Sequence, residues 1–463
     1  MDDDHNKNFM ALDDDEDVPS FPSVEVDVEN SSEAVASEDD DVNEICEAMH
    51  LTMTTTAVSL VGNGGGGVCV GIFVDGLICQ TFVKKITLWE VHLDLNACDK
   101  LASLLRNPGS CLTVLHLYAN DIGNGGAIKL AKGFLDNSTL KELMLREFEA
   151  MEVGQKAIFD SLQGTKCKLE MLHLRVHNIK EASALSLSCV LRHHHGTIKS
   201  LQLENSFVSS MDNDYDEHDN IGIICQPMLD RNSVLEKLVL SNDILTNAVV
   251  YALTKALTEN NRLRMLDLSI NIYVSAEAWE IFSEALRNPY SVLEVLKLED
   301  CYNVNDAMHS FADALSRNKM LKELRVGGCY GMYDTYDAID ALIHTLCNTS
   351  SILSTFNSNH TLERICNERE ENEFSEDLMC LLRINRHKSK AARLKIIKSH
   401  FSGPSIKDKP FNVDMMKLRV RPHAIAWMAK DKHLYQFLRA MPWLIRKVED
   451  NAVTNSKKRS RDE

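Results

Sequence analysis

A short leucine pattern recurs along most of this chain at a nearly constant spacing. The first clear copy is LTVLHLYAN, with leucines at 112, 115 and 117 and an asparagine at 120. Seven further clear copies begin at Leu140, Leu169, Ile198, Leu235, Leu263, Leu293 and Leu321, a weaker one at Val83 and a degenerate one at Leu353. Successive copies start 28 to 32 residues apart, except for one step of 37. Such a period indicates a repeat array, and it constrains the fold more than any other feature of the chain.

Each copy is predicted to fold as a strand followed by a helix. The segments between the leucine patterns, such as NAVVYALTKALTENN, carry apolar residues at i, i+3, i+4 and i+7. One strand–helix unit cannot bury both of its faces, so neighbouring units must stack. We therefore predict an α/β solenoid shaped as a horseshoe, with a parallel sheet on the inner wall, helices on the outer wall and the leucines between them.

The pattern L-x-x-L-x-L-x-x-N/C, together with full helices, resembles the ribonuclease-inhibitor type of leucine-rich repeat over roughly residues 83–365. In that family the last position of the pattern hydrogen-bonds the turning backbone. It is Asn or Cys here at Asn120, Asn271, Cys301 and Cys329, whereas the other clear copies, for which looser turns are expected, hold Phe148, His177, Ser206 and Asp243. The run SNHTLERI and the helical segment after it are also similar to leucine-rich-repeat proteins of single-celled algae, a resemblance that implies no activity.

Charge divides the chain into further segments. Residues 1–50 hold 18 Asp or Glu and a single Lys, and they carry too little apolar surface to offset the entropy of folding. Residues 376–463 hold 21 Lys or Arg against 9 Asp or Glu, and much of this part reads as helical. The predicted domains are a disordered acidic tail at 1–50, an N-terminal cap hairpin at 51–82, leucine-rich repeats at 83–365, a basic helical C-terminal region at 366–450 that caps the array, and a basic disordered tail at 451–463.

A glycine-rich segment, LVGNGGGGVCVGIFVDG at 60–76, contains the spacing Gly62-x-Gly64-x-x-Gly67 of loops that bind phosphates. A dinucleotide fold requires a helix directly after the glycines, whereas VCVGIFV, rich in β-branched residues, predicts a strand. Val68 stands where a Walker loop needs lysine, and the HRD and DFG motifs of protein kinases do not follow. We therefore predict a hairpin, with TAVSLV and VCVGIFV as strands and the glycines in the turn.

The sequence predicts neither catalysis nor a metal nor a cofactor. The insertion SSMDNDYDEHDNIG at 209–222 has three aspartates at calcium-loop spacing but lacks the required glycine and bidentate glutamate, so it is predicted to be an acidic loop. The consecutive histidines at 193–195 end a helical pattern and point in different directions, unlike zinc ligands. The motifs of common hydrolases, such as GxSxG and HExxH, are absent from the sequence.

Cysteine usage and hydropathy favour an intracellular protein. The 13 cysteines include no CxxC pair and are too sparse for a disulfide scaffold. The N-terminus lacks the features of a signal peptide, and no apolar run reaches the about 18 residues of a membrane span. A cytoplasmic or nuclear location is predicted.

The sheet face on the inside of the horseshoe is the predicted binding site. Residues that flank the leucines of each strand point outward, and they combine charge with several larger side chains, which suits a protein partner. The predicted partner-binding residues are His116, Tyr118, Met144, Arg146, His173, Arg175, Gln202, Glu204, Asp267, Ser269, Lys297, Glu299 and Arg325. We predict a non-enzymatic protein-interaction scaffold, whose partner the sequence does not identify.

Two alternative functions follow from other features. The Ran GTPase-activating protein has the same kind of repeat and an acidic segment, which implies a regulator of small GTPases. The basic C-terminal region favours instead a nuclear protein that contacts nucleic acid. The predicted nuclear-import signal consists of Arg446, Lys447, Lys457, Lys458, Arg459 and Arg461.

Overall fold

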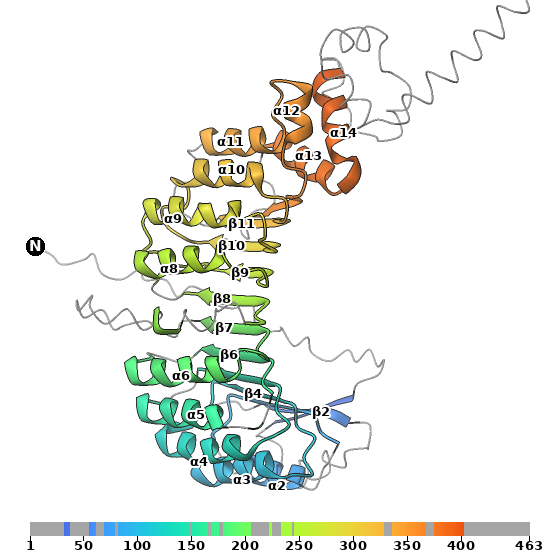
Figure 1. Cartoon of the computed structure of the whole chain (residues 1–463). Coiled ribbons are helices and arrows are strands. Elements are labelled where there is room, and N and C mark those ends of the chain that lie inside the picture. Colours follow the sequence, from blue (N-terminus) through green and yellow to red (C-terminus); the bar gives the residue numbers. More distant parts are fainter. Residues whose placement is uncertain are drawn as a thin grey trace, which may run out of the picture.

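Parallel strands stacked in sequence order form the backbone of the molecule (Figure 1). The computed structural model describes residues 32–37, 55–61, 69–78, 82–147, 150–164, 166, 168–175, 179–204, 222–224, 233–242, 245–327, 336–366 and 375–401. Its sheet consists of β1 (Ser32–Ser37), β2 (Thr55–Val61), β3 (Lys85–Trp89), β4 (Val114–Tyr118), β5 (Glu142–Arg146), β6 (Met171–Arg175), β7 (Ser200–Glu204), β8 (Lys237–Ser241), β9 (Met265–Asp267), β10 (Val295–Glu299), β11 (Glu323–Gly327) and β12 (Arg364–Cys366). The predicted α/β leucine-rich-repeat solenoid is confirmed.

Helices alternate with the strands and stack beside one another (Figure 1). The repeat helices are α2 (Cys69–Ile78), α3 (Leu95–Arg106), α4 (Gly123–Asp136), α5 (Glu152–Gly164), α6 (Glu181–His193), α8 (Asn247–Leu257), α9 (Ala276–Ser283), η2 (Glu284–Arg287), α10 (Met308–Arg317), α11 (Tyr336–Leu346) and α12 (Ile352–Asn357). A C-terminal cap follows, made of α13 (Glu376–Asn385), η4 (Lys388–Lys390), α14 (Ala391–Ile396) and η5 (Ile397–Phe401).

The pattern leucines form a continuous layer between sheet and helices. Leu88, Leu117 and Leu145 are direct neighbours across β3, β4 and β5, and each is at most 1% exposed. Phe134 of α4 and Leu162 of α5 close the layer from the helix side and are equally buried. Because each unit buries its leucines against the next, this hydrophobic layer is shared by the whole array.

Side chains at the end of the leucine pattern tie each repeat to the one before it. Nδ2 of Asn120 donates to the carbonyl of Leu88 at 3.0 Å, and Nδ2 of Asn271 donates to the carbonyl of Leu240 at 2.9 Å. The thiol of Cys301 makes the equivalent bond at 3.0 Å. These contacts satisfy buried carbonyls at the turns. The equivalent positions of the other clear copies lie outside the described residues.

A second series of donors lies where the helices end. Asn318 donates from Nδ2 to the carbonyl of Leu286 at 2.7 Å, and its Oδ1 accepts the N–H groups of Met320 and Leu321 at 2.8 and 2.7 Å. One side chain thus joins a helix end, the preceding helix and the start of the next strand. The helix-end donors equivalent to Asn318 are Asn137, His194, Asn288 and Asn359, which contact the carbonyls of Leu105, Leu162, Leu257 and Leu315.

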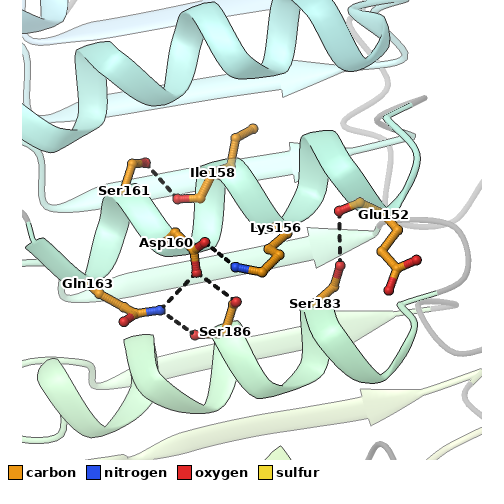
Figure 2. Close-up of polar contacts among 8 residues, drawn as sticks. All are labelled: Glu152, Lys156, Ile158, Asp160, Ser161, Gln163, Ser183 and Ser186. Atoms are coloured by element: carbon orange, nitrogen blue, oxygen red, sulfur yellow. Dashed lines mark hydrogen bonds and ion pairs between the residues drawn. The ribbon is translucent and has the colours of Figure 1, made fainter.

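The outer helices pack closely because small residues line their contacts. A Cβ added to Gly133 of α4 would lie 2.6 Å from the Cα of Ala102 in α3, so only glycine fits there. Figure 2 shows polar contacts between α5 and α6, where the carboxylate of Asp160 accepts hydrogen bonds from Lys156 in its own helix and from Ser186 in the next. Small side chains and short polar contacts together set the spacing of the repeats.

The predicted N-terminal hairpin at 51–82 is wrong. β2 pairs in parallel with β3, and Cys69–Val74 of the predicted second strand lie in helix α2. Val70, Val74 and Leu77 fall at helical spacing and are 0 to 1% exposed, so burial in the leucine layer outweighs the strand preference of the β-branched residues. A helix does follow the glycines, so the sequence-based objection to a dinucleotide loop is wrong as well. Because β2 pairs in register with β3, the segment formed by β2 and α2 belongs to the repeats. Gly62, Gly64 and Gly67 themselves lie outside the described residues.

The repeat array begins well before the predicted 83–365 and ends close to the predicted boundary, at Cys366. Residues 32–37, predicted to lie in a disordered tail, form β1 and pair with β2, so that prediction is wrong for these residues. The predicted copy at Leu353 is not a strand, because Oγ of Ser351 accepts the N–H of Ser354 at 3.0 Å and caps helix α12. The last strand, β12, follows the buried Leu362.

The C-terminal cap supplies the polar contacts that a further repeat would otherwise make. Nδ2 of Asn385 in α13 donates to the carbonyl of Leu362 at 2.6 Å. Nζ of Lys395 in α14 donates to the carbonyls of Leu346 and Asn359 at 2.5 and 2.6 Å. The array therefore ends without orphaned carbonyls at these positions. The remainder of the predicted basic helical region, at 402–450, and the tail at 451–463 lie outside the described residues.

We expect Asn318→Ala to lower the free energy of unfolding by about 3 kcal/mol, because each buried group left unsatisfied costs roughly 1–3 kcal/mol and Asn318 is only 4% exposed. Asn261→Ala, at an exposed position, serves as the matched control and should cost less than about 0.5 kcal/mol. Urea denaturation of both variants measures the difference. Equal stabilities would contradict the structural role of the helix-end asparagines.

Candidate functional site

The strand residues that alternate with the leucines lie on the sheet face that points away from the helices, which we call the open face. Strand register arranges them there in three rows. Each five-residue strand contributes its first, third and fifth residue to this face, while the second and fourth are the buried aliphatic residues of the repeat pattern. The third-residue row contains His116, Met144, His173, Gln202, Asp267, Lys297 and Arg325. The fifth-residue row contains Tyr118, Arg146, Arg175, Glu204 and Glu299, and Ser269 follows β9 at the same level.

An aromatic–arginine stack runs along the fifth-residue row at the N-terminal end of the array. The rings of Trp89 in β3 and Tyr118 in β4 stack with centroids 5.0 Å apart and planes inclined by 24°. The guanidinium carbon of Arg146 in β5 lies 5.8 Å from the Tyr118 ring, within cation–π range. All three side chains are partly exposed. Burial raises the pKa of Tyr118, although Arg146 acts in the opposite direction, so the phenol is neutral at physiological pH.

Two histidine–glutamate pairs hold the same end of the face in place. Nε2 of His116 lies 2.8 Å from the carboxylate of Glu142, and this hydrogen bond lowers the pKa of Glu142. Nε2 of His173 lies 3.1 Å from the carboxylate of Glu204, which also pairs with Arg146 at 3.8 Å. Burial of Glu204 disfavours ionisation, yet its pKa is lowered because His173 and Arg146 surround it. Both carboxylates are therefore ionised at neutral pH.

The C-terminal half of the face carries ion pairs but no aromatic stack among its described residues. Lys297 pairs with Asp267 at 3.1 Å, and Arg325 pairs with Glu323 at 2.7 Å. Asp267 and Glu323 are only 7% and 3% exposed. Glu299 is also buried, and its backbone N–H donates to Oγ of Ser269, just after the neighbouring strand β9, at 3.2 Å. The predicted charged surface is thus a half-buried, internally paired network.

Sequence reasoning missed several members of this face. Trp89 belongs to the weak copy at Val83, and its position is that of Tyr118 in the next repeat. Glu142 and Glu323 precede the second leucine of their copies, where the strand has already begun. The in–out alternation of the strand residues would have identified Glu142 and Glu323 if it had been started one position earlier. Applied to the weak copy at Val83, it would also have identified Trp89.

Left-handed backbone conformations end many strands and shape the rim of the open face. Glu90, Ala119, Glu147, Asn242, Ile270 and Asp300 all follow strand residues with φ between 47° and 60°. Where these residues follow β3, β4 and β5, each N–H donates to the carbonyl of the next strand at 2.7 to 3.0 Å, which offsets the strain of the left-handed conformation. Three apolar side chains on the loops after β9 and β10 are exposed: Ile270, Tyr273 and Tyr302.

The other sequence features fall into two groups. The triple histidine lies at the end of α6, where buried His194 contacts the carbonyl of Leu162 at 3.1 Å as a helix-end donor. In the described part of the chain, no three His, Cys, Asp or Glu side chains gather closely enough to hold a metal ion. The predicted import-signal residues at 446–461, and the acidic insertion at 209–221, lie outside the described residues.

The period, the leucine layer and the side-chain donors to the preceding repeat define the chain as a leucine-rich-repeat protein of the ribonuclease-inhibitor-like type. It is 26% identical to the ribonuclease inhibitor of Mus musculus over 234 residues, which cover 50% of this chain and 49% of that protein. The inhibitor of Sus scrofa is 26% identical over 309 residues, 60% of this chain and 65% of its own length. The NACHT, LRR and PYD domains-containing protein 14 of Mus musculus is 28% identical over 243 residues, 52% of this chain and 23% of that protein.

The chain therefore spans about a quarter of the NACHT protein and half to two thirds of the inhibitors. No family model matches it. A solved structure from Bacteroides fragilis aligns with a TM-score of 0.32 at 10% identity, covering 62% of this chain and 72% of that one, which is too distant to inform the fold.

His194 makes the stability of the array sensitive to acid. Burial lowers its pKa below the ordinary 6.5, so the unfolded chain binds a proton more readily than the folded one once the pH falls below about 6.5. We expect the wild-type chain to lose stability from there downward, and His194→Asn, which can donate to the same carbonyl, to lose less. Thermal unfolding at pH 8, 6 and 5 measures both. Identical pH profiles would contradict a neutral His194.

Proposed function

We propose that this chain is a non-enzymatic scaffold that binds a protein partner on the open face of its repeats. The observation that carries the proposal is the partly exposed stack of Trp89, Tyr118 and Arg146. Trp, Tyr and Arg are the residue types that contribute most to protein–protein affinity. The comparisons support protein binding in general, since the relatives are named as inhibitors of ribonuclease and as proteins with leucine-rich repeats. The partner's identity is not implied by those names.

The surroundings of the stack suit a protein surface. Met144, in the third-residue row of β5, contributes apolar, adaptable area beside it, and Met171, in the first-residue row of β6, adds to this area further along the face; both are partly exposed. Arg146 and Arg175 are held by loose ion pairs to Glu204 and Glu147 at 3.8 and 3.7 Å. Such pairs keep the guanidinium groups oriented before a partner arrives, which reduces the entropy lost on binding.

The whole predicted set remains the proposed contact surface, with the stack at its N-terminal end. The exposed apolar side chains of Ile270, Tyr273 and Tyr302 extend it at the C-terminal rim, because exposed aromatic groups beside a polar face are typical of interfaces. The proposed partner-binding residues are His116, Tyr118, Met144, Arg146, His173, Arg175, Gln202, Glu204, Asp267, Lys297, Glu299 and Arg325. We place the interaction inside the cell, in agreement with the sequence; no helix among the described residues is long and apolar enough to cross a membrane.

We expect Tyr118→Ala and Arg146→Ala each to weaken partner binding by about 30-fold, equivalent to roughly 2 kcal/mol. Tyr251→Ala and Arg262→Ala, which alter exposed residues outside the open face, are the matched controls. Affinity capture with the full chain identifies partners, and calorimetry on a purified partner measures the loss. Capture of the same partners at the same affinity by the Tyr118 and Arg146 variants would refute the open-face proposal.

A second candidate function, contact with a nucleic-acid backbone, is favoured by one exposed turn. Arg386, His387, Lys388 and Lys390 lie between α13 and α14 and are all exposed. The described carboxylates of the cap pair elsewhere, Glu376 with Arg383 and Asp377 with Lys398. This turn continues the basic character of residues 376–463. The small-GTPase regulator stays a prediction that rests on resemblance, and stimulated GTP hydrolysis would test it.

We expect any affinity for duplex DNA to fall steeply between 50 and 200 mM salt, because phosphate contacts release counterions. Replacing Lys388 and Lys390 with Gln should weaken binding and reduce the magnitude of the salt slope by about 2, at about 0.9 per contact. Lys255→Gln, at an exposed position on α8, is the control. Salt-independent binding, or equal slopes for all variants in a fluorescence titration, would exclude this role.

A further inference from the structure

A buried lysine fastens the C-terminal cap to the last repeats. Lys395 of α14 is 0% exposed, and its Nζ donates to the carbonyls of Leu346 and Asn359 at 2.5 and 2.6 Å. Leu346 is the last residue of α11, so its carbonyl lies at the partially negative end of that helix. Lys395 thus occupies the place that an asparagine occupies at earlier helix ends, where Asn359 contacts Leu315.

The basic groups around Lys395 are bonded to neutral partners. Nζ of Lys319 lies 3.5 Å from the carbonyl of Ser358, and Nε2 of His360 lies 3.0 Å from the carbonyl of Phe356. On the cap itself, Nε2 of His400 lies 2.9 Å from the hydroxyl oxygen of Thr355.

Among the remaining titratable groups of the junction, the Cys347 thiol acts to raise the pKa of Lys395, against the larger effect of burial. The thiol of Cys347, after α11, lies 3.2 Å from the hydroxyl of Ser399. On the cap, Asp377 pairs with Lys398 at 3.7 Å, and Arg393 is partly exposed. Among the described residues, no carboxylate lies within ion-pair distance of Lys395, although a buried cation normally has one.

This environment favours the uncharged amine. Burial lowers the pKa of Lys395 to about 7, and the nearby charge of Lys319 acts in the same direction. Burial lowers the pKa of His360 to about 4, and the charge of nearby Lys395 contributes to this shift as the second-largest cause. A neutral amine has two N–H groups, which match the two carbonyls, whereas the ammonium adds a charge and a third N–H. Protonation therefore weakens the junction without adding a described partner.

We propose that Lys395 is a proton-sensitive latch, in which the neutral amine holds α13 and α14 on the last repeats and undocking of this cap is coupled to the uptake of one proton by Lys395. Once the cap undocks, the carbonyls of Leu346, Asn359 and Leu362 lose their side-chain donors from the cap. The latch thus decides whether the last repeat is closed or available for further contacts.

The direction of the pH dependence follows from the two protonation states. In the undocked cap Lys395 regains an ordinary pKa of 10.5, against about 7 when docked. Between these values the undocked form binds one more proton, so docking strengthens about tenfold per pH unit as the pH rises. Below pH 7 Lys395 is protonated in both forms and adds no further dependence. His360 weakens docking in the same direction between about pH 6.5 and 4.

Cys347 is a natural reporter of the latch, because it is buried at the junction. Alkylation of the full-length chain at pH 7, 8 and 9, resolved by peptide mass spectrometry, gives its labelling rate. The exposed Cys189 corrects for the rise in thiolate with pH, and Cys301, buried within the array, reports global unfolding. We expect the ratio of the Cys347 rate to the Cys189 rate to fall about 50-fold from pH 7 to 9, because docked Lys395 is about half protonated at pH 7, while Cys301 stays protected.

Lys395→Met keeps the buried stem but cannot titrate, so its Cys347 ratio should be flat over the same range. Lys398→Met, which removes a partly exposed lysine of the adjoining element η5, is the matched control and should keep the wild-type slope. A flat wild-type ratio, a Lys395→Met variant with the wild-type slope, or equal labelling of Cys301 and Cys347 would each overturn the latch. If Lys395→Met does not fold, the wild-type profiles of Cys347 and Cys301 decide the question alone.

Discussion

Hydrogen bonds from side chains to the backbone of the preceding repeat are the interaction on which this structure depends. Parallel strands satisfy each other's backbone hydrogen-bonding groups along the sheet. Turns and helix ends, however, leave buried carbonyls without a backbone partner, and in a solenoid this recurs in every repeat. Asn120 and Asn271 satisfy them at the strand ends, and Asn318 and its equivalents do so at the helix ends. Each of these bonds crosses to the neighbouring repeat. Stacking therefore buries the leucines and provides hydrogen-bond partners for the carbonyls at the same time, and a single repeat could do neither.

The same constraint produces the open face. Fixed register places side chains of equal strand position beside one another, about 4.8 Å apart, so an aromatic residue in one repeat necessarily meets its equivalent in the next. Trp89 and Tyr118 stack for this reason, and Arg146 lies over Tyr118 because it occupies the third place in the row. The crowding also explains why Glu204 is ionised although it is partly buried: the neighbouring strands supply His173 and Arg146.

The sequence predicted what is periodic and failed where another force prevailed over local preference. The strand starts, the leucine layer and the positions facing outward follow from spacing alone. Helix α2 was missed because its valines favour strands in isolation, while only burial against β2 and β3 makes a helix there. The helix-end asparagines carried a readable signal, since Asn137 and Asn318 stand three residues before the first leucine of the next copy. The ion pairs of the open face could not be predicted, because pairing such as that of Glu204 with Arg146 two strands away depends on side-chain geometry.

An array built this way has no natural end, since every repeat presents carbonyls for the next one. The cap resolves this with Asn385 and Lys395, but a lysine differs from an asparagine in one respect: it can carry a charge. An asparagine at this place would give a permanent closure, as at the earlier helix ends. A buried amine without a carboxylate nearby gives a closure whose strength depends on protons, and it couples the end of the array to the solution. The same kind of contact that makes the inner repeats rigid thus makes the last junction adjustable.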